Sequence, residues 1–237
     1  FGLNKELKKP NLEASEHTLL MAKAYAGYYV NRPQEAIESI EKLMKDHADK
    51  MRGGYSFNLV FLQAESYGMA GQYAKAAETY ETIIERIKQW VDPETSGHNA
   101  FLRRYLALSK FQPQKMVLNS TATIPAKTDK MGLITVPVTM GNKTLDFIFS
   151  TGSGYCAISE DNAKQMGIKD TGIEMDGFDD SNNLQVKMKL GVAEKMKIGN
   201  VEFENILFLI KPGKLTEKDA PDYAINGMIG LNAMLIM

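Results

Sequence analysis

The hydrophobic period of this sequence changes once, near the middle of the chain, and this change limits the folds that the chain can adopt. Before residue 112, apolar residues recur every three or four positions, which places them on one face of an α-helix. From Leu133 onward the period falls to two, so that successive side chains alternate between the two faces of a β-strand. The sequence therefore predicts an α-helical region followed by an all-β region.

A stretch without either period separates the two regions. It contains two prolines and a polar cluster, and both features are typical of linkers. We predict a helical domain over 1–112, a linker over 113–131 and a β domain over 132–237. With 237 residues, the chain is long enough for each domain to bury its own core.

The helical region contains a repeated helix–turn–helix pattern. Apolar residues at helical spacing fill 13–46, and the same arrangement returns in 56–89. Aligning Ala36 with Ala76 superposes the two copies at an offset of 40 residues. A third helix over 97–111 is expected to cap the array. The predicted architecture is a set of antiparallel helical hairpins.

The second copy resembles a tetratricopeptide repeat at its small, aromatic and turn positions. These positions are Ala64, Tyr67, Gly71, Tyr73, Ala76 and Tyr80. The first copy is degenerate, and its offset is longer than the roughly 34 residues of that family. Two interpretations stay open: a surface that binds a protein partner, or a hairpin array without a groove.

The β region contains two similar hairpins and one distinctive loop. Gly141-Asn142 and Gly199-Asn200 supply tight turns between alternating strands. A buried strand over 145–149 runs into the small-residue sequence Ser150-Thr151-Gly152-Ser153-Gly154. The strand end Ala157-Ile158-Ser159 and a short helix, which Ser159 can cap, follow.

From Leu133 onward the chain resembles one lobe of a retropepsin-like aspartic peptidase. In that family, an apolar strand leads into Asp-Thr-Gly; Thr151 and Gly152 match this motif, and Ser150 stands at the aspartate. The segment Gly227-Met228-Ile229-Gly230-Leu231-Asn232 resembles the family's hydrophobic-hydrophobic-glycine motif. The resemblance implies an all-β lobe with Ser150, Thr151 and Gly152 at the catalytic position. It also implies that the domain is truncated before its final strand.

The serine changes the chemistry that the family position can perform. Aspartic peptidases need two facing carboxylates that share one proton, and a single lobe supplies one of them, so the resemblance implies a homodimer. A serine hydroxyl does not ionise near neutral pH. Losing general acid–base catalysis typically costs ~10²–10⁴ in rate. We therefore expect the chain as written to be inactive as an aspartic peptidase.

The sequence of this loop permits two other interpretations. Ser150 acting as a nucleophile would require a base such as histidine, and all three histidines (17, 47 and 98) belong to the helical region. Gly152-Ser153-Gly154 followed by Ala157 also fits a loose dinucleotide-binding pattern. The segment after it has the period of strands instead of a βαβ unit, which speaks against that pattern.

Further residues are expected to contact a substrate. Ser153 and Gly154 continue the loop, and the resemblance implies that Gly177, Phe178 and Asp179 belong to a hairpin flap that closes over an extended peptide. The alternative for 177–183 is an exposed polar loop. Peptide or protein substrates are the expected partners.

Composition and charge exclude several classes of function. A formal net charge of −1 gives no bulk attraction to nucleic acid, and no apolar run approaches the length of a membrane span. Cys156 is the only cysteine, and the histidines are not spaced as metal ligands, so we predict no disulfide, metal or other cofactor. The chain opens at Phe1 and stops in an apolar stretch. We expect a longer natural protein that is exported, periplasmic or secreted, with its signal segment missing here.

Three functions remain from these observations. The first is an aspartic endopeptidase in an inactivated form, carried by the sequence around Ser150. The second is a natural pseudopeptidase whose cleft still holds extended peptides. The third is a scaffold that binds a protein partner on its helical repeats.

Overall fold

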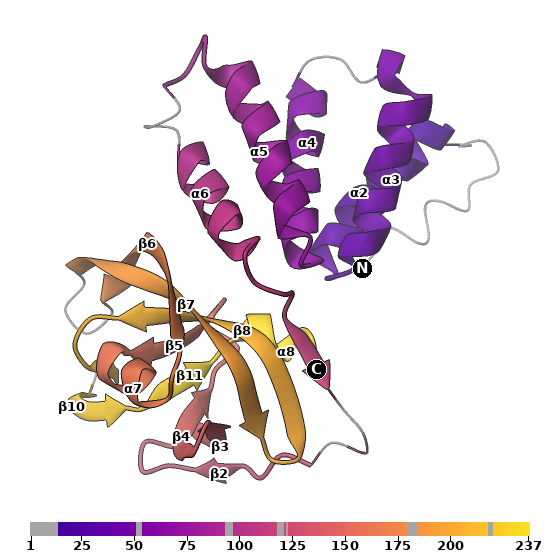
Figure 1. Ribbon diagram of the computed structural model, residues 1–237. Coiled ribbons are helices and arrows are strands. Elements are labelled where there is room, and N and C mark those ends of the chain that lie inside the picture. The colour runs from indigo at the N-terminus through magenta and orange to yellow at the C-terminus, as the bar shows by residue number, and fades with distance from the viewer. Residues whose placement is uncertain are drawn as a thin grey trace. The chain divides into compact units, whose positions relative to one another are not determined.

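The computed structural model describes residues 14–50, 54–92, 97–117, 121, 123–179, 184–217 and 220–237. The chain forms two compact units, Phe1–Tyr105 and Leu106–Met237, called here the helical unit and the β unit (Figure 1). Helices make up the first and a β-barrel the second, so the predicted fold class is confirmed.

The described helices of the helical unit follow one another as hairpins. They are α2 (Glu16–Tyr29), α3 (Pro33–Asp46), the 3-10 turn η1 (Ala48–Lys50), α4 (Gly54–Met69), α5 (Tyr73–Ile87) and α6 (His98–Leu108). Helix α2 packs against α3 and helix α4 against α5, while α3 also contacts α4. Ala36 and Ala76 are fully buried at equivalent places in the two hairpins, where a larger side chain would hold the paired helices apart.

Both hairpins turn through the same hydrogen-bonded motif. In the first, Asn31 has a φ of 58° and the next amide donates to the carbonyl oxygen of Gly27 at 2.7 Å. In the second, Gly71 has a φ of 72° and the amide of Gln72 donates to the backbone carbonyl oxygen of Tyr67 at 2.8 Å. This is the Schellman motif, in which a left-handed residue ends a helix. The repeat seen in the sequence is therefore present in the backbone.

Helix α6 packs on the second hairpin through aromatic rings. The rings of Phe101 and Tyr80 stack with centroids 5.4 Å apart, and the ring of Tyr105 lies 5.7 Å from that of Tyr80. Gly68 on α4 leaves room for this contact, because a Cβ there would lie only 2.2 Å from the Tyr105 hydroxyl oxygen. The expected third helix is present.

The β unit consists of strands of very different lengths and two short helices. Its elements are β1 (Lys115–Val117), β2 (Lys127–Thr128), β3 (Ile134–Met140), β4 (Lys143–Phe149), β5 (Cys156–Ser159), α7 (Glu160–Gln165), β6 (Lys169–Asp179), β7 (Leu184–Ile198), β8 (Val201–Lys211), β9 (Leu215–Glu217), β10 (Ala220–Ile225), β11 (Gly227–Ile229) and α8 (Leu231–Met234).

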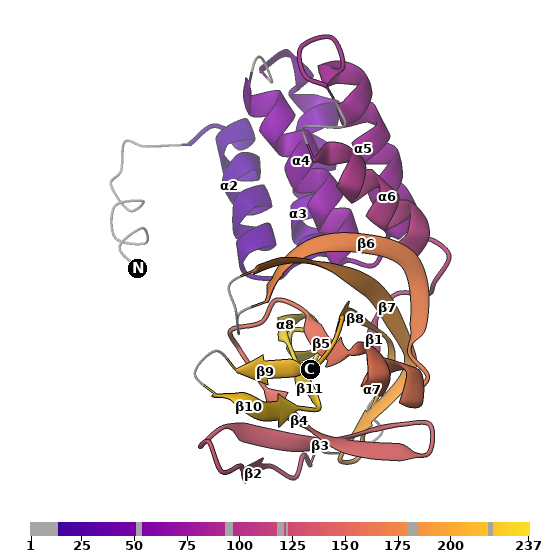
Figure 2. The ribbon, with the colours of Figure 1, turned by 90° about the vertical axis from the view of Figure 1, so that its left-hand side faces the viewer.

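The main sheet closes on itself into a barrel (Figure 2). Strands β8, β5, β11, β4, β3 and β7 are neighbours in that order, and β7 pairs again with β8. Closure leaves no free edge within this ring. Phe147, Phe203 and Phe208 are fully buried in its core.

The two hairpin turns are built alike. Gly141 and Gly199 have φ values of 59° and 60°, and each is followed by an asparagine before the returning strand. A glycine with positive φ at the first turn position is the requirement of a two-residue type II′ hairpin. Both turns lie where the sequence predicts them.

Two strands lie within 113–131, the segment expected to be a linker. Strand β1 pairs with residues 202–204 of β8, and β2 pairs with residues 134 and 135 of β3. The described parts of this segment are therefore joined to the β unit by backbone hydrogen bonds.

Candidate functional site

The predicted site loop connects β4 to β5, and β11 lies between these two strands. Strand β11 is parallel to β4, with Ile229 opposite Phe149, and antiparallel to β5, with Gly227 opposite Ile158. A chain segment from the end of the sequence thus fills the gap that opens where β4 and β5 diverge. The resulting framework holds both ends of the loop 150–155.

Ser150 is fixed at the start of this loop by its backbone. Its amide donates a hydrogen bond of 3.0 Å to the carbonyl oxygen of Ile229 on β11. A Cβ at Gly152 would lie 3.7 Å from the Ser150 Oγ, so the hydroxyl is directed toward Gly152. Ser150 is half-buried, while Thr151 and Gly152 are exposed. The three residues predicted at the catalytic position therefore form one turn that faces solvent.

The rest of the loop is held by α8. The amide of Leu231 donates to the carbonyl oxygen of Ser153 at 2.8 Å, and the amide of Asn232 donates to that of Gly154 at 3.1 Å. The Ser153 hydroxyl donates to the carbonyl oxygen of Tyr155 at 2.6 Å. A Cβ at Gly154 would meet no described atom within 4 Å. The backbone of Ser153 and Gly154 is thus fixed from one side and open on the other.

Asn232 ends the segment that resembles the hydrophobic-hydrophobic-glycine motif, but the sequence did not predict its side-chain contacts. Its Oδ1 accepts a hydrogen bond of 2.7 Å from the amide of Cys156, and its Nδ2 donates to the carbonyl oxygen of Leu207 at 2.9 Å. The side chain therefore joins α8, β5 and β8 beneath the loop. The available signal was a polar residue inside an otherwise apolar helix.

The sole cysteine lies against the same framework. Cys156 is fully buried, and its Sγ accepts a hydrogen bond of 3.4 Å from the amide of Gly230. Burial raises the pKa of the Cys156 thiol to about 12. The thiol is therefore neutral at physiological pH and is no nucleophile.

The helix after β5 confirms a local prediction. Ser159 precedes α7, and its Oγ accepts a hydrogen bond of 3.3 Å from the amide of Asn162. The Asn162 Nδ2 donates to the carbonyl oxygen of Asn226, just before β11, at 2.9 Å. The capped helix is therefore tied to the strand that supports Ser150.

The predicted flap residues lie at the end of a long hairpin. Strands β6 and β7 pair over most of their length, and Gly177, Phe178 and Asp179 stand opposite residues 186, 185 and 184. The side chains of Phe178 and Asp179, and all of 180–183, lie outside the described residues. The backbone of 177–179 is thus part of the antiparallel β6–β7 pair.

Two carboxylates of the β unit, those of Asp146 and Asp129, have hydrogen-bond partners outside the site loop. Asp146 on β4 accepts from the Lys127 Nζ at 2.7 Å. Asp129 accepts from the Tyr223 hydroxyl at 2.5 Å, and this hydrogen bond lowers the pKa of the Asp129 carboxyl. No cluster of three His, Cys, Asp or Glu side chains suited to a metal ion occurs among the residues that the structure describes.

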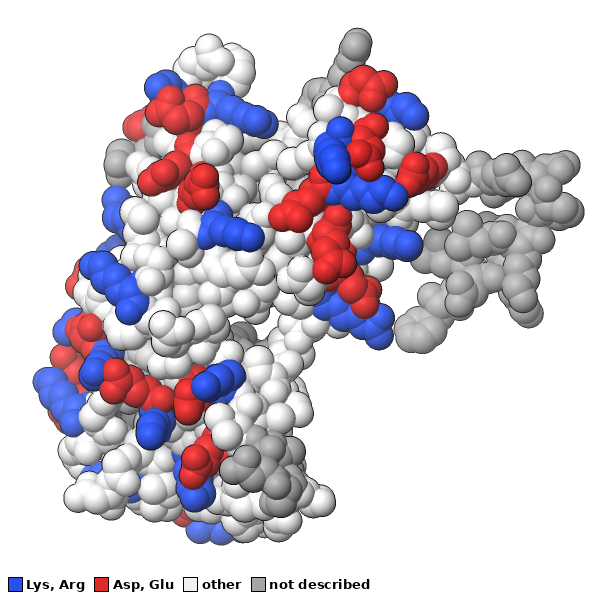
Figure 3. Space-filling model, turned by 45° about the vertical axis from the view of Figure 1, so that its right-hand side comes forward, with Lys and Arg blue, Asp and Glu red and all other residues white. Residues whose placement is uncertain are grey.

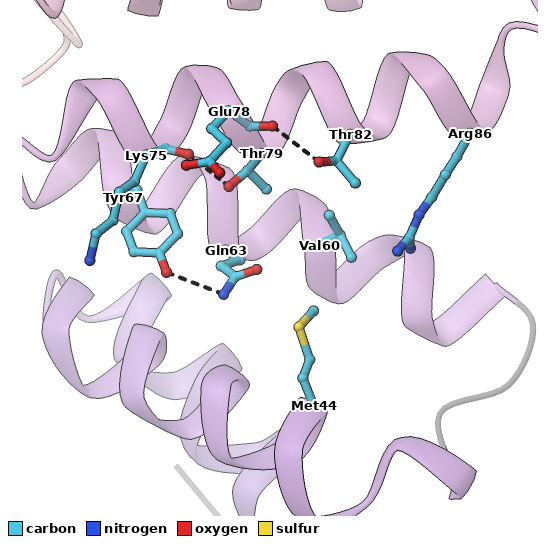
Figure 4. Close-up of a pocket in the computed structure, with 9 residues that line it drawn as sticks. All are labelled: Met44, Val60, Gln63, Tyr67, Lys75, Glu78, Thr79, Thr82 and Arg86. Carbon is cyan, nitrogen blue, oxygen red and sulfur yellow. Dashed lines mark hydrogen bonds between the residues drawn. The ribbon is translucent and has the colours of Figure 1, made fainter.

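A separate pocket of about 380 Å³ belongs to the helical unit and includes no residue of the 150–155 loop. Figure 4 shows its lining, with Lys75 and Arg86 of α5 toward opposite ends and Met44 of α3 across from Val60 of α4. The hydroxyl of Tyr67 accepts from the Gln63 Nε2 at 3.4 Å and donates to Glu41 at 2.8 Å. The pocket is amphipathic and carries charges of both signs.

Charges of both signs are also interspersed over the surface seen in Figure 3. This mixing agrees with the net charge of −1. Within the described ranges, no helix has the length and apolarity that a bilayer crossing requires.

A known protein family matches residues of the β unit. Residues 136–233 match the model of a family described as aspartyl protease. The chain is also similar to the crystal structure of a retropepsin-like aspartic protease from Rickettsia conorii, at 17% sequence identity and a TM-score of 0.32. That match covers 49% of this chain and 82% of the other chain. No curated protein matches the sequence. The family match confirms the predicted resemblance to retropepsin-like aspartic peptidases.

Proposed function

We propose that the β unit is the lobe of an aspartic endopeptidase in which Ser150 occupies the place of the catalytic carboxylate. Thr151 and Gly152 complete the catalytic turn. Ser153, Gly154 and the hairpin residues Gly177, Phe178 and Asp179 bind an extended peptide. As written, the lobe holds such a peptide without cleaving it, because a serine hydroxyl cannot serve as the general base.

One observation carries this proposal. The turn that begins at Ser150 leaves β4 where β11 has been inserted between β4 and β5, and the Ser150 amide is held by Ile229. This arrangement fixes the backbone of residue 150 independently of its side chain. An aspartate introduced at residue 150 would project its carboxylate from the same fixed backbone. The second carboxylate of the catalytic pair would have to come from a second lobe.

The experiment compares cleavage of a peptide library at acidic and neutral pH by three full-length proteins: the chain as given, Ser150→Asp and Ser150→Asn. Asparagine has the shape of aspartate but cannot act as a base, so it is the matched control. We expect cleavage by Ser150→Asp alone, at least ~10²-fold above the other two.

The outcomes separate the two peptide-binding hypotheses. Cleavage by Ser150→Asp alone supports the inactivated peptidase. If none of the three proteins cleaves, while all fold and bind library peptides equally, the peptidase function fails and the natural pseudopeptidase is favoured. In that case, deletion of 177–183 should abolish peptide binding.

A second candidate function is a protein-binding scaffold in the helical unit. The amphipathic pocket among α3, α4 and α5 favours it, since a partner side chain could enter between Met44 and Val60 while its neighbours meet the charges of Lys75 and Arg86. Binding of a partner that persists after removal of all residues beyond 131 would support this function. Binding that requires the β unit would contradict it.

A further inference from the structure

A glutamine from the segment that precedes the barrel reaches the framework of the site loop. Gln114 stands just before β1, and its Oε1 accepts a hydrogen bond of 2.9 Å from the Asn232 Nδ2. The same oxygen accepts from the amide of Leu207 at 3.0 Å. Two donors converge on one oxygen, so the orientation of the glutamine side chain is determined: its carbonyl oxygen, and not its NH₂ group, faces Asn232.

The amide side chain of Asn232 is fully used by these contacts. Its Oδ1 accepts from the Cys156 amide at 2.7 Å. One Nδ2 hydrogen goes to the carbonyl oxygen of Leu207 at 2.9 Å, and the other goes to Gln114. Because an amide has two donor hydrogens and both are engaged, only one orientation of Asn232 satisfies its surroundings.

That orientation matters for the loop. If the Asn232 side chain rotated, its Oδ1 would no longer face Cys156, where the loop ends and β5 begins. The Asn232 backbone amide, which donates to the carbonyl oxygen of Gly154 at 3.1 Å, belongs to the same residue. Gln114 is thus linked, through one asparagine, to two points of the loop that starts at Ser150.

Gln114 is itself held from both sides. The carbonyl oxygen of Pro113 accepts a hydrogen bond of 3.3 Å from the Asn205 Nδ2, and β1, which begins at the next residue, pairs with β8 at Glu204. The residue lies outside 136–233, the residues that match the family model. The segment between α6 and the barrel therefore supplies a hydrogen-bond acceptor for Asn232 and Leu207 that residues 136–233 do not contain.

We infer that Gln114 is a positioning residue for the loop 150–155 and the start of β5, acting through Asn232, so that a residue preceding the barrel supports the peptide site. As a statement about peptide binding, the inference rests on the function proposed above. The physical link does not rest on it, because it concerns the hydrogen bonds by which Asn232 holds Gly154 and Cys156.

The sole cysteine provides a native probe for this link. The Cys156 thiol is buried in the barrel core next to the Gly230 amide, so it reacts with a reagent such as 5,5′-dithiobis(2-nitrobenzoate) only when the structure around it opens. We compare full-length Gln114→Leu, which removes the acceptor, with Gln114→Glu, which retains acceptor oxygens at the same reach. Leaving the Leu207 amide and one Asn232 hydrogen without a partner should raise the labelling rate about 10-fold in Gln114→Leu. Gln114→Glu should stay within about 2-fold of the unmodified chain.

Two controls separate positioning from general destabilisation. Ile198→Val removes a methyl group from a fully buried core position and lowers global stability. Its labelling should depend steeply on urea, whereas labelling of Gln114→Leu should be nearly independent of urea, because the opening is local. In an Asn232→Ala background, Gln114→Leu should raise the labelling rate by a smaller factor than in the unmodified chain, because only its contact with the Leu207 amide is left to lose.

The inference is overturned if Gln114→Leu labels at the rate of the unmodified chain, if Gln114→Glu accelerates labelling equally, or if the acceleration follows global unfolding. In the Ser150→Asp protein, Gln114→Leu should also lower kcat/KM, and Gln114→Glu should restore it. If Ser150→Asp cleaves nothing, the peptidase function fails, and the labelling rates still decide whether Gln114 positions the loop.

Discussion

The Cα of Gly230 lies against the backbone of Tyr155, so closely that a Cβ at residue 230 would stand 2.3 Å from the Tyr155 carbonyl oxygen. This contact brings the chain leaving β11 against the end of the site loop. Its closeness explains why a glycine is needed here although the φ of Gly230, −104°, is available to any residue. Glycine is therefore required at residue 230 for steric reasons and not for its backbone conformation.

The first prediction follows from that contact. Gly230→Ala should destabilise the β unit by ~1–3 kcal/mol, because backbone atoms must move to admit the methyl group. Urea unfolding followed by far-UV circular dichroism measures the change. Gly154→Ala is the matched control: a Cβ there meets nothing within 4 Å, and we expect no loss of stability. Equal losses in both variants would contradict the steric explanation.

A second prediction concerns the dimer that the proposed function requires. Each lobe contributes one residue 150, so a competent carboxylate pair needs two copies. The specific activity of Ser150→Asp should therefore fall on dilution, in step with the loss of dimer seen by analytical ultracentrifugation. Activity that persists at concentrations where only monomer remains would rule out a homodimeric site.

The third prediction is a dependence of stability on alkaline pH. Burial, followed by the hydrogen bond to Glu41, raises the pKa of Tyr67 to about 12, above the value near 10 of an unfolded tyrosine. The folded state thus favours the neutral phenol. Its contribution is complete below about pH 10 and is lost as pH rises toward 12.

Tyr67→Phe should therefore flatten the fall in stability between pH 10 and pH 12, as measured by urea unfolding of the helical unit. Burial beside Glu65 also raises the pKa of Tyr80, so part of the fall should remain. Tyr29→Phe serves as the control, since Tyr29 is 77% exposed. A slope unchanged in Tyr67→Phe would refute the assignment.

The fourth prediction tests the repeated turn. Gly71→Ala should cost ~1–2 kcal/mol, because a Cβ disfavours the left-handed conformation at φ 72°. Gly71→Asn should cost less, since asparagine occupies the equivalent position 31 with a φ of 58°. Thermal unfolding of the unmodified chain, Gly71→Asn and Gly71→Ala should rank their stabilities in that descending order. Equal loss in both variants would mean that the turn has no left-handed requirement.

Much of the fold could be predicted because it is encoded locally. The helical period before residue 112 and the alternation after Leu133 separate the two units, and Gly141 and Gly199 mark turns that need positive φ. The Ser159 cap of α7 follows from the residues at its own terminus. Each of these features depends on neighbours within a few positions.

The supporting framework of the candidate site could not be predicted in the same way. The hydrogen bond from Cys156 to Asn232 joins residues 76 positions apart, and that from Asn232 to Gln114 joins residues 118 positions apart. Asparagine and glutamine occur widely as surface residues. Asn232 was marked only as a polar residue in an otherwise apolar helix, and neither position indicated its hydrogen-bond partners. The short strands within 113–131 were missed as well, because their pairing depends on β3 and β8 and not on their own period.

The sequence by itself determined the order of the two units, the period of each, the tight turns and the place of Ser150 at the end of an apolar strand, since side-chain spacing and glycine stereochemistry act over short distances. Tertiary structure alone decided that β11 enters between β4 and β5, that Gly230 must be small, and that Gln114 and Asn232 hold the loop. These depend on which distant segments meet once the barrel closes, and a hydrogen bond across such a separation has no local pattern in the chain.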